Sequence, residues 1–488
     1  MTASSAMGGA LWRWPDWLER EQASRVVMPL SLFVAALVVN LFHITAKSFG
    51  LDEATSVYYA SQPLGSLIEI LTRRDPNMSV YYFVLRGWMH GFGEGETAVR
   101  SLSAVSAALA VPAIYYLGRL LFGSAAGLLS AVLLMLNAFS VEYAQTARAY
   151  APVMLLVILS SIAFVLELER PSRANRVAYV VASTLAFYTQ YFAALVVVAH
   201  ALVLLVTRRR AGLTRERWTM AAILALLWLP ELVIAARVGS SARLGWVQPL
   251  SLERIHWAAT AFAGQSDAVL MLLLAAGCYG LARGMAAGRA WPHVLAGAWF
   301  AVPIVVTVLV SLRTPIFVPR FLIVCVPGLI LFGAAGIASI RSPTVAALLV
   351  GLVAWPAAIQ VREYYGADAD EDWRSATRHV LAAAKPGDAI KFFLDYNRRP
   401  FDYYGRLAGV PGPTNLERRP LTGSPRVWLV NRQYEADGRA EDFERLRSEL
   451  RAQYRLVQQS QLLRVGVVLY ARCRFSPHDC SLQSVRVR

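Results

Sequence analysis

The sequence has few charged residues. Asp, Glu, Lys and Arg make up 16% of its 488 residues, whereas hydrophobic residues make up 56%. A soluble chain of this length would need more polar surface, because folding leaves much of a chain facing water. With a mean hydropathy of +0.44, the composition excludes an ordinary soluble enzyme and indicates a protein embedded in a membrane.

The sequence also lacks the motifs of several enzyme classes. It contains no Walker-type phosphate loop, no Gly-x-Ser-x-Gly elbow and no Cys-x-x-Cys. Its seven histidines include no close pair at metal-ligand spacing. The net charge of +16 comes without a nucleic-acid recognition motif, so anionic lipid heads or phosphate-bearing ligands suit it better than nucleic acid.

Long hydrophobic runs are what the chain has instead. About 20 residues are needed to cross roughly 30 Å of hydrocarbon as a helix, and eleven runs approach that length. We therefore predict a polytopic α-helical membrane protein with about 11 transmembrane helices. Two runs meet at Gln190-Tyr191, so ten or twelve spans would also fit. The runs cover 26–46, 98–121, 124–141, 150–168, 176–190, 191–207, 218–237, 267–284, 292–311, 319–339 and 344–361.

Arginine is concentrated in loops that would be cytoplasmic if the N-terminus is inside, notably at 170–176 and 208–217. The loop at about 47–97 and the segment after 361 are then outside. We predict a transmembrane domain at 1–361 and an extracytoplasmic domain at 362–488, in a multi-pass protein of the cell inner (plasma) membrane.

The segment after 361 has the patterning of soluble structure, with 16 acidic residues in its 127 positions. Its alternation of helix and strand patterns predicts a small α/β domain. The expected elements are helices at 370–384 and 439–453, strands at 389–394 and 426–431, and further strands within 455–471.

A pair of carboxylates, Asp52 and Glu53, follows the first hydrophobic run. The first 361 residues carry only 16 acidic side chains, so a pair at the membrane boundary suggests chemistry. The loop that begins there is about 50 residues long, and long loops are often functional. Apolar and aromatic residues at helical spacing in 64–71 and 79–92 predict amphipathic helices lying at the membrane interface.

Polar residues also recur between two of the hydrophobic runs. If 142–150 is helical, Glu142, Gln145 and Arg148 lie along one side of it. An acid, an amide and a guanidinium would then point into one cavity. The alternative is that Glu142 and Arg148 merely satisfy each other.

Two arginines, Arg313 and Arg320, lie in a short outward loop before the tenth run. Guanidinium groups bind phosphate through charge and forked donors. Snorkelling to the interface is an equally good reading of Arg313, whereas the position of Arg320 beside Pro319 at a helix start favours a function.

Several motifs follow one another along the chain: Leu51-Asp52-Glu53-Ala54, Asp75-Pro76-Asn77, Tyr81-Tyr82, Trp88, Tyr143 to Tyr150, Pro319-Arg320-Phe321, Glu371-Asp372-Trp373-Arg374 and Pro386-Gly387-Asp388. Their order resembles the GT-C membrane glycosyltransferases, and within them the bacterial protein-mannosyltransferase-like and aminoarabinose-transferase-like group, glycosyltransferase family 39. Two stretches depart from the pattern of that group: Gln190-Tyr191, where many members carry His-Tyr, and Asn77-Met78-Ser79, where others often carry His-Pro-Pro.

The resemblance implies transfer of a sugar from a polyprenyl-phosphate donor to a protein, lipid or cell-envelope glycan on the outer face, with inversion at the sugar. A first-loop acid, Asp52, is then the base, because an attacking hydroxyl must lose its proton; Glu53 orients the acceptor, shares a metal with Asp52 or faces water. The donor phosphate is assigned to Arg148, Arg320 and Arg313. The substrate-binding candidates are Glu142, Gln145, Tyr150, Asp75, Tyr81, Tyr82 and Tyr191.

The family resemblance implies no required cofactor. A divalent ion held by Asp75 and His256 is a further expectation that the sequence leaves open, beside the reading of His256 as an ordinary interfacial residue. Two other function classes also stay open: a transporter or lipid flippase without transferase activity, and a non-catalytic assembly protein. Against a transporter, no internal repeat is evident, and the polar residues gather on one membrane face.

Overall fold

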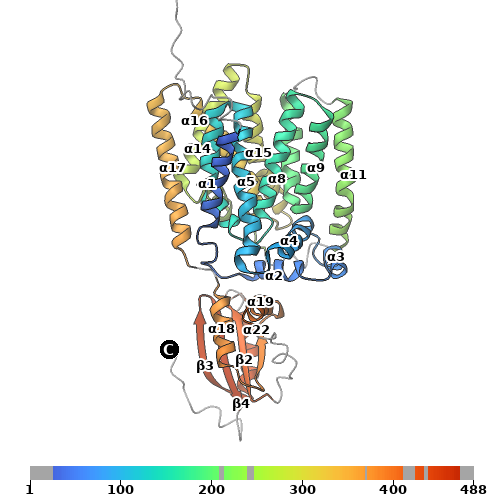
Figure 1. Cartoon of the computed structure of the whole chain (residues 1–488), viewed down its shortest axis with the longest axis vertical. Helices are drawn as coiled ribbons and strands as arrows, with labels where there is room; N and C mark the ends of the chain where they lie inside the picture. Colours follow the sequence, from blue (N-terminus) through green and yellow to red (C-terminus); the bar gives the residue numbers. More distant parts are fainter. Residues whose placement is uncertain are drawn as a thin grey trace, which may run out of the picture. The chain divides into compact units, whose positions relative to one another are not determined.

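The computed structural model describes residues 26–207, 214–238, 247–368, 371–409, 424–433 and 438–472. The described chain packs as two compact units (Figure 1). The helical unit consists of the chain up to Phe42, Pro63–Gly87 and Arg100–Gly366, and the second unit consists of His43–Gln62, Trp88–Val99 and the chain from Ala367. The first outward loop, assigned from the sequence to the transmembrane domain, is therefore divided, and part of it packs with the C-terminal segment.

The polytopic helical membrane fold expected from the composition is confirmed. Within the described residues, seven helices are long and apolar enough to span a membrane, or eight if α6 and α7, which are bent by 61°, form one broken span. The main helices of this part are α1 (Met28–Leu41), α5 (Glu96–Phe122), α6 (Ser124–Met135), α7 (Ala138–Ala144), α8 (Tyr150–Glu169), α9 (Arg173–Thr189), α10 (Ala194–Thr207), α11 (Arg215–Val238), α13 (Leu252–Phe262), α14 (Asp267–Ala286), α15 (Trp291–Ser311), α16 (Val326–Ala338) and α17 (Pro343–Gly366).

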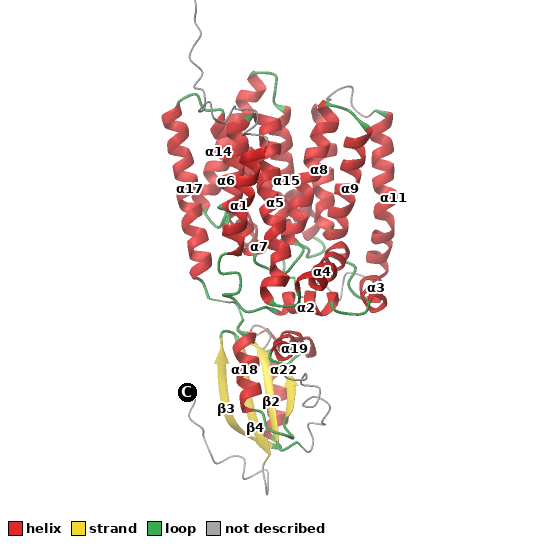
Figure 2. Cartoon of the chain, in the orientation of Figure 1, coloured by secondary structure: helices red, strands yellow, loops and turns green. Residues whose placement is uncertain are grey.

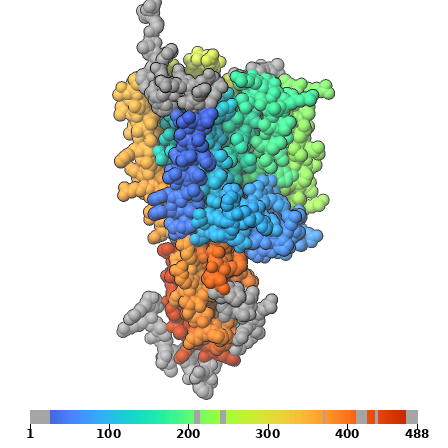
Figure 3. All heavy atoms as spheres, in the orientation of Figure 1, coloured from blue at the N-terminus to red at the C-terminus, as the bar shows by residue number. Residues whose placement is uncertain are grey.

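The helices differ in how much apolar surface they expose. In α11 and α17, 17% and 22% of the most apolar stretch is buried, against 89% for the stretch Pro319–Ala338. Side chains of α1 such as Val34 and Val38 are also exposed, and α1 lies on the visible surface in Figure 3. Exposed aliphatic faces on helices of this length are those that lipid covers. The stretch at 319–338 forms the centre of the bundle.

Close packing at that centre depends on glycine. A Cβ on Gly336 of α16 would overlap the carbonyl of Ala276 in α14, and one on Gly277 of α14 would overlap the Phe332 ring. Small residues let two helix backbones approach closely. In a membrane the hydrophobic effect does not drive helices together, so such close packing is what holds them. This contact fixes α16, the helix that follows Arg320 in the chain.

The first loop forms the helices that its spacing predicts. The stretches at 64–71 and 79–92 are confirmed as α3 (Leu64–Arg73) and α4 (Ser79–Phe92). In α3, Leu67 and Leu71 are buried while Leu64 is exposed, as expected for an amphipathic helix. The conditional expectation of a helix across 142–150 is wrong, because α7 ends at Ala144 and the next helix begins at Tyr150.

The C-terminal segment is the α/β domain that its sequence predicts (Figure 2). Four strands lie in the order β1-β2-β4-β3, with β1 and β2 parallel and the other pairs antiparallel. Sequence patterns missed the third helix of this domain, α19. The elements are α18 (Trp373–Ala383), β1 (Ala389–Phe392), α19 (Arg398–Leu407), β2 (Arg426–Arg432), α22 (Ala440–Arg451), β3 (Tyr454–Leu462) and β4 (Val465–Arg472).

The sheet of this domain is covered on both faces. Val427 and Leu429 of β2 share a core with Leu450 of α22. Trp428 lies between them in sequence and so points to the other face, where its ring meets His379 of α18. This burial of both faces explains the continuous apolar run of β2.

An ion pair holds the edge of that sheet. Arg426 Nε donates to Asp388 Oδ1 at 2.8 Å, and Trp428 Nε1 and the Lys385 backbone N–H donate to Asp388 Oδ2 at 3.0 and 2.9 Å. Burial by itself would raise the pKa of Asp388, but these donors outweigh it and lower the pKa below 3.8. The pair therefore stabilises the domain fully above pH 3.8, and that contribution is lost as the pH falls through the lowered value.

Replacing Arg426 with Met should loosen this domain. The variant leaves the buried carboxylate without its partner, a loss of about 2 kcal/mol after allowance for the partial exposure of Arg426. Backbone amides of β1 and β2 should then exchange with deuterium roughly 30-fold faster in the full-length protein. Arg445→Ala is the control, because Arg445 lies 3.9 Å from Asp442 in an exposed pair worth little. Unchanged exchange in the Arg426 variant would contradict the prediction.

Candidate active site

Arg148 lies at the centre of an aromatic cluster in the helical unit. Its Nη1 donates to the Tyr82 hydroxyl of α4 at 3.3 Å, and its guanidinium lies 6.0 Å from the ring centre of Tyr150. The turn that carries it is held by Ser103 of α5, whose hydroxyl donates to the Arg148 carbonyl at 3.2 Å. The guanidinium is therefore positioned by the non-helical turn that follows the end of α7 at Ala144, and not by a continuous helix.

The cluster continues to the second predicted arginine. Tyr150 stacks on Phe321 with ring centres 6.4 Å apart, and the guanidinium of Arg320 lies 5.8 Å from the centre of the Phe321 ring. Arg320 and Phe321 belong to the 3-10 segment η5 (Pro319–Cys325), which precedes α16. The structure therefore brings Arg148, Tyr150 and Arg320 together, although 172 residues of sequence separate the two arginines.

A second 3-10 segment at the start of a helix contacts η5. The 3-10 segment η3 (Tyr191–Ala193) precedes α10, and its Phe192 ring lies 5.5 Å from Phe321 of η5. Irregular backbone at membrane depth is tolerated where protein buries it or where it lines a wet cavity. The contact between η3 and η5 therefore marks this region of the bundle as the place where polar groups lie within the membrane.

Among the buried polar groups near these breaks, two neutral side chains have no hydrogen-bond partner within the described ranges. They are the side-chain amide of Gln190, which is fully buried, and the hydroxyl of Tyr150, which is 1% exposed. Leaving a buried polar group unpaired costs about 1–3 kcal/mol. Such groups are accounted for if a ligand supplies the missing partner.

Tyr191 takes part in a different contact. Its hydroxyl donates to Glu231 Oε1 of α11 at 3.1 Å, and Glu231 is 4% exposed. The Ser79 hydroxyl donates to the Tyr188 carbonyl at 3.1 Å, so α4 and the end of α9 are joined beside this pair. The Glu231 carboxylate is thereby tied to Tyr191 in the helical unit.

Gln145 has partners that explain it without a ligand. Its side-chain Nε2 donates to the carbonyls of Asn40 and Phe42 at 3.0 and 2.6 Å, and its Oε1 accepts from Tyr364 at 3.3 Å. The residue therefore joins α1, α7 and α17. Helix ends leave carbonyls without partners inside the helix, and the buried amide of Gln145 donates hydrogen bonds to two such carbonyls.

The remaining candidates of the helical unit are more scattered. Glu142 is half-buried at the end of α7, and Asp75 is half-buried just after α3. Tyr81 is buried beside Tyr82, with ring centres 5.6 Å apart. Arg313 is exposed, which suits an interfacial side chain better than a binding group.

His256 pairs with Asp267, at 2.8 Å from Nε2 to Oδ1, and both side chains are about two-thirds exposed. In the ranges that the structure covers, no three His, Cys, Asp or Glu side chains are grouped so as to hold a metal. The geometry gives no support to the expected ion held by His256 and Asp75.

The two first-loop carboxylates lie in the second unit, in the first turn of α2 (Leu51–Ala60). Glu53 is 6% exposed, and its Oε2 accepts from the Gly50 backbone N–H at 3.4 Å. This is the reach-back of a capping box, in which the third helical residue satisfies the helix start. Asp52 is half-buried, so the structure gives the two neighbours different environments.

Helix α2 is held by α19 of the C-terminal segment. Arg399 Nη1 donates to the Thr55 hydroxyl at 3.1 Å, and its guanidinium lies 5.3 and 5.5 Å from the ring centres of Tyr58 and Tyr59. One guanidinium thus binds three side chains on successive turns of the helix that carries Asp52.

The chain that enters α2 is held by the same segment. The Phe49 backbone N–H donates to the Tyr404 hydroxyl at 2.6 Å. That hydroxyl in turn donates to Glu96, which Arg374 binds at 2.6 Å. Burial and the bond to Glu96 raise the pKa of Tyr404, so it remains a donor. We call Arg399, Arg374, Tyr404 and Glu96 the α2 clamp.

Sequence reasoning missed the α2 clamp and the Gln190 side-chain amide, whereas Tyr150 was among its substrate-binding candidates. Arg374 did appear among the residues that carry the family resemblance, and Gln190 among the departures from it. The contacts of the α2 clamp join positions hundreds of residues apart, which no local sequence pattern encodes. Tyr404 and Arg399 lie in α19, the helix that was not predicted.

The broken helices, the cationic aromatic cluster and the α/β domain belong to a polytopic membrane protein, and its likeness to solved structures shows the GT-C fold. The sequence profile of the family described as dolichyl-phosphate-mannose-protein mannosyltransferase matches residues 77–234. That range includes Arg148, Tyr150 and Gln190 and excludes α2. A search of curated protein sequences found no match.

Solved structures show the same fold at low sequence identity. ArnT from Cupriavidus metallidurans, bound to undecaprenyl phosphate, has a TM-score of 0.59 and 13% identity, over 92% of this chain and 98% of that one. The Archaeoglobus fulgidus oligosaccharyltransferase tethered to an acceptor peptide has a TM-score of 0.55 and 13% identity, over 95% and 76%. The AglB oligosaccharyltransferase from the same organism, in complex with an inhibitory peptide and a dolichol-phosphate, has a TM-score of 0.56 and 11% identity, over 92% and 74%.

Proposed function

We propose that this protein is a glycosyltransferase that moves a sugar from a polyprenyl-phosphate donor to an acceptor on the outer face of the membrane. The observation that carries the proposal is the cluster of Arg148, Tyr150 and Arg320 at two interrupted helices. The bound undecaprenyl phosphate and dolichol-phosphate of the two structurally similar proteins support a lipid phosphate as the ligand.

The arginines of this cluster suit the leaving group. As the bond between the sugar and the phosphate breaks, the lipid phosphate gains negative charge. Guanidinium groups fixed in a partly dry region stabilise such developing charge strongly. The unpartnered Tyr150 hydroxyl and Gln190 amide supply hydrogen-bond donors for phosphate or sugar oxygens. In this proposal the helical unit binds the donor.

Asp52 supplies the base. An acceptor hydroxyl attacks the anomeric carbon, its O–C bond forms as the bond to the lipid phosphate breaks, and its proton passes to the Asp52 carboxylate. A single direct displacement inverts the anomeric centre. Glu53 is the weaker candidate, because its carboxylate is buried in the capping box of α2.

The direct test is transfer by the purified protein in nanodiscs. Polyprenyl-phosphate sugars and nucleotide sugars are each offered with protein, lipid and glycan acceptors, and products are followed by mass spectrometry with the anomeric configuration determined by NMR. Transfer from a lipid-linked donor with inversion is expected. Transfer only from nucleotide sugars would contradict the donor class. Movement of the lipid-linked sugar across the bilayer without transfer would favour the flippase alternative.

The α2 clamp yields a prediction about positioning. Arg399→Ala removes the hydrogen bond to Thr55 and both ring contacts, so α2 holds Asp52 less firmly. We expect kcat to fall about 5- to 30-fold, or about 1–2 kcal/mol, with the KM for the lipid-linked donor unchanged. Steady-state kinetics with the natural donor class measure both values.

The matched control for this prediction is the neighbouring residue. Arg398 pairs with Asp402 within α19 at 3.0 Å, so Arg398→Ala should keep kcat within about 2-fold. Arg399→Lys retains the charge over the tyrosine rings and should recover part of the loss. A fall in donor affinity at constant kcat would show that Arg399 does not act through the base.

A further inference from the structure

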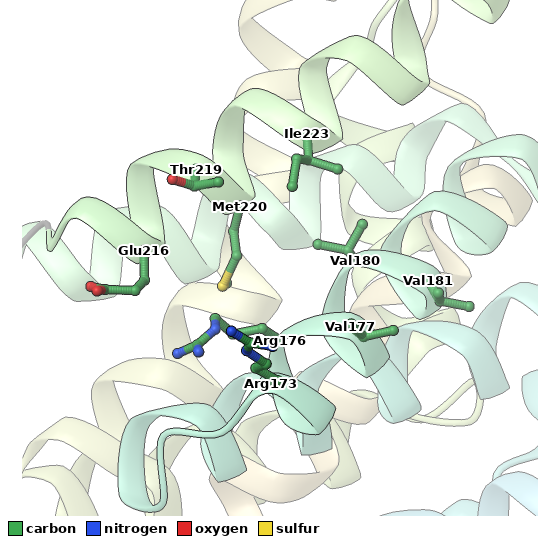
Figure 4. A pocket seen from close by; sticks show the side chains of 9 residues that line it. All are labelled: Arg173, Arg176, Val177, Val180, Val181, Glu216, Thr219, Met220 and Ile223. Carbon is green, nitrogen blue, oxygen red and sulfur yellow. The ribbon is translucent and has the colours of Figure 1, made fainter.

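A cavity lies between α9 and α11, at the ends where these two helices begin. Its volume is about 380 Å³. Arg173 and Arg176 of the first turn of α9 lie at one side, and aliphatic side chains, including Val180 and Ile223, form the walls (Figure 4). The cavity therefore combines a cationic end with apolar sides.

The charges at the cationic end are not all neutralised by partners. Arg176 pairs with the buried Glu167 at 3.2 Å. The Glu216 carboxylate accepts hydrogen bonds from its own backbone N–H and from Thr214, so it caps the start of α11. Arg173 has no ion pair with any residue for which the structure gives a position. One guanidinium is thus left to bind an anion.

The apolar walls open toward the lipid. Val177 and Val181 of α9 are 62% and 49% exposed, and Ile223 of α11 is 42% exposed. On membrane-spanning helices such side chains contact acyl chains. Free phosphate would use only the cationic end of this cavity, whereas a phospholipid places its phosphate on the arginines and an acyl chain along the valines.

This cavity is separate from the candidate active site. Tyr191 follows the end of α9, and its partner Glu231 is 15 residues beyond Glu216 in α11. At about 1.5 Å per residue, the cavity and the Tyr191–Glu231 contact are roughly 20–25 Å apart along the same two helices. They lie toward opposite faces of the membrane, and the arginine-rich loops at 170–176 and 208–217 place the cavity on the predicted cytoplasmic side.

We propose that this cavity binds one anionic phospholipid of the surrounding leaflet, with its phosphate on Arg173 and Arg176. Basic pockets between membrane helices on the cytoplasmic side suit such head groups. The occupied cavity would fill the space between α9, which ends just before Tyr191, and α11, which carries Glu231 toward its other end. The site does not depend on the proposed transferase activity.

The experiment uses native mass spectrometry of the full-length protein titrated with phosphatidylglycerol or phosphatidylcholine. Wild type should bind one phosphatidylglycerol in preference. Arg173→Gln should weaken that binding about 5-fold, since one arginine near a lipid head is worth about 1 kcal/mol. Val180→Trp, which fills the cavity and leaves both arginines, should weaken it as well. Arg341→Gln is the control, because Arg341 is an exposed arginine of another predicted cytoplasmic loop.

Three results would overturn the proposal. The first is equal binding of the two lipids by wild type. The second is unchanged binding of phosphatidylglycerol in both the Arg173 and the Val180 variants. The third is full displacement of the lipid by inorganic phosphate, which would show that the site recognises a free anion. Because the readout is lipid binding, none of these results bears on whether sugar is transferred.

Discussion

Asp52→Asn should lower the rate of glycosyl transfer by about 10²- to 10⁴-fold, the range for loss of a positioned general base. Asparagine has nearly the same shape, so α2 and its contacts with α19 remain. It cannot accept the proton of the acceptor hydroxyl at neutral pH. The measurement is single-turnover transfer from a lipid-linked donor, with donor binding determined separately. A folded variant that keeps full transfer would remove Asp52 from the mechanism.

Glu53→Gln is the matched control for Asp52. The amide oxygen of glutamine can still accept from the Gly50 N–H and keep the capping box. We expect at most about a 3-fold loss of rate, and a loss of at most about 0.7 kcal/mol of stability at the helix start. If instead Glu53→Gln abolishes transfer and Asp52→Asn does not, the assignment of the base is reversed.

The sequence predicts the elements of this fold well because their signals are local. Hydrophobic runs long enough to cross a bilayer, amphipathic spacing in 79–92 and strand patterns at 426–431 each depend on near neighbours in the chain. The turn after Ala144 was harder, because nothing in 142–150 breaks a helix by composition. Tertiary contacts such as that of Ser103 with the Arg148 carbonyl hold it open.

The residue types of the candidate site could be predicted from the sequence, but the contacts between those residues could not. Arg148 was singled out because a polar side chain at membrane depth needs a functional or pairing reason, and Arg320 because it lies beside Pro319 at a helix start. That Tyr150 and Phe321 join them depends on two broken helices meeting in space. The contacts of Gln145 were hidden for the same reason, since its side-chain amide donates to carbonyls at the end of α1 that no spacing rule reveals.

Arg148→Gln should lower kcat by about 10²- to 10³-fold, the usual loss when one preorganised group that stabilises transition-state charge is removed. Arg148→Lys keeps the charge but loses the planar fork and the stacking on Tyr150, so an intermediate rate is expected. Arg313→Gln is the control, because Arg313 is exposed; its rate should stay within about 2-fold.

A structural role for Arg148 must be separated from a catalytic one, because its contacts with Tyr82 and Tyr150 also support packing. Tyr150→Phe makes the distinction: the ring that stacks on Phe321 is kept, and only a hydroxyl without a partner in the described part of the chain is removed. Thermal stability should not fall, since an unpaired buried hydroxyl contributes none. If that hydroxyl binds the donor, transfer should fall about 10-fold at unchanged stability. If Tyr150→Phe keeps full activity, the Tyr150 hydroxyl does not bind the donor, and Arg148 is left as the donor-binding group of this turn. If Tyr150→Phe is destabilised, the aromatic cluster around Arg148 serves packing.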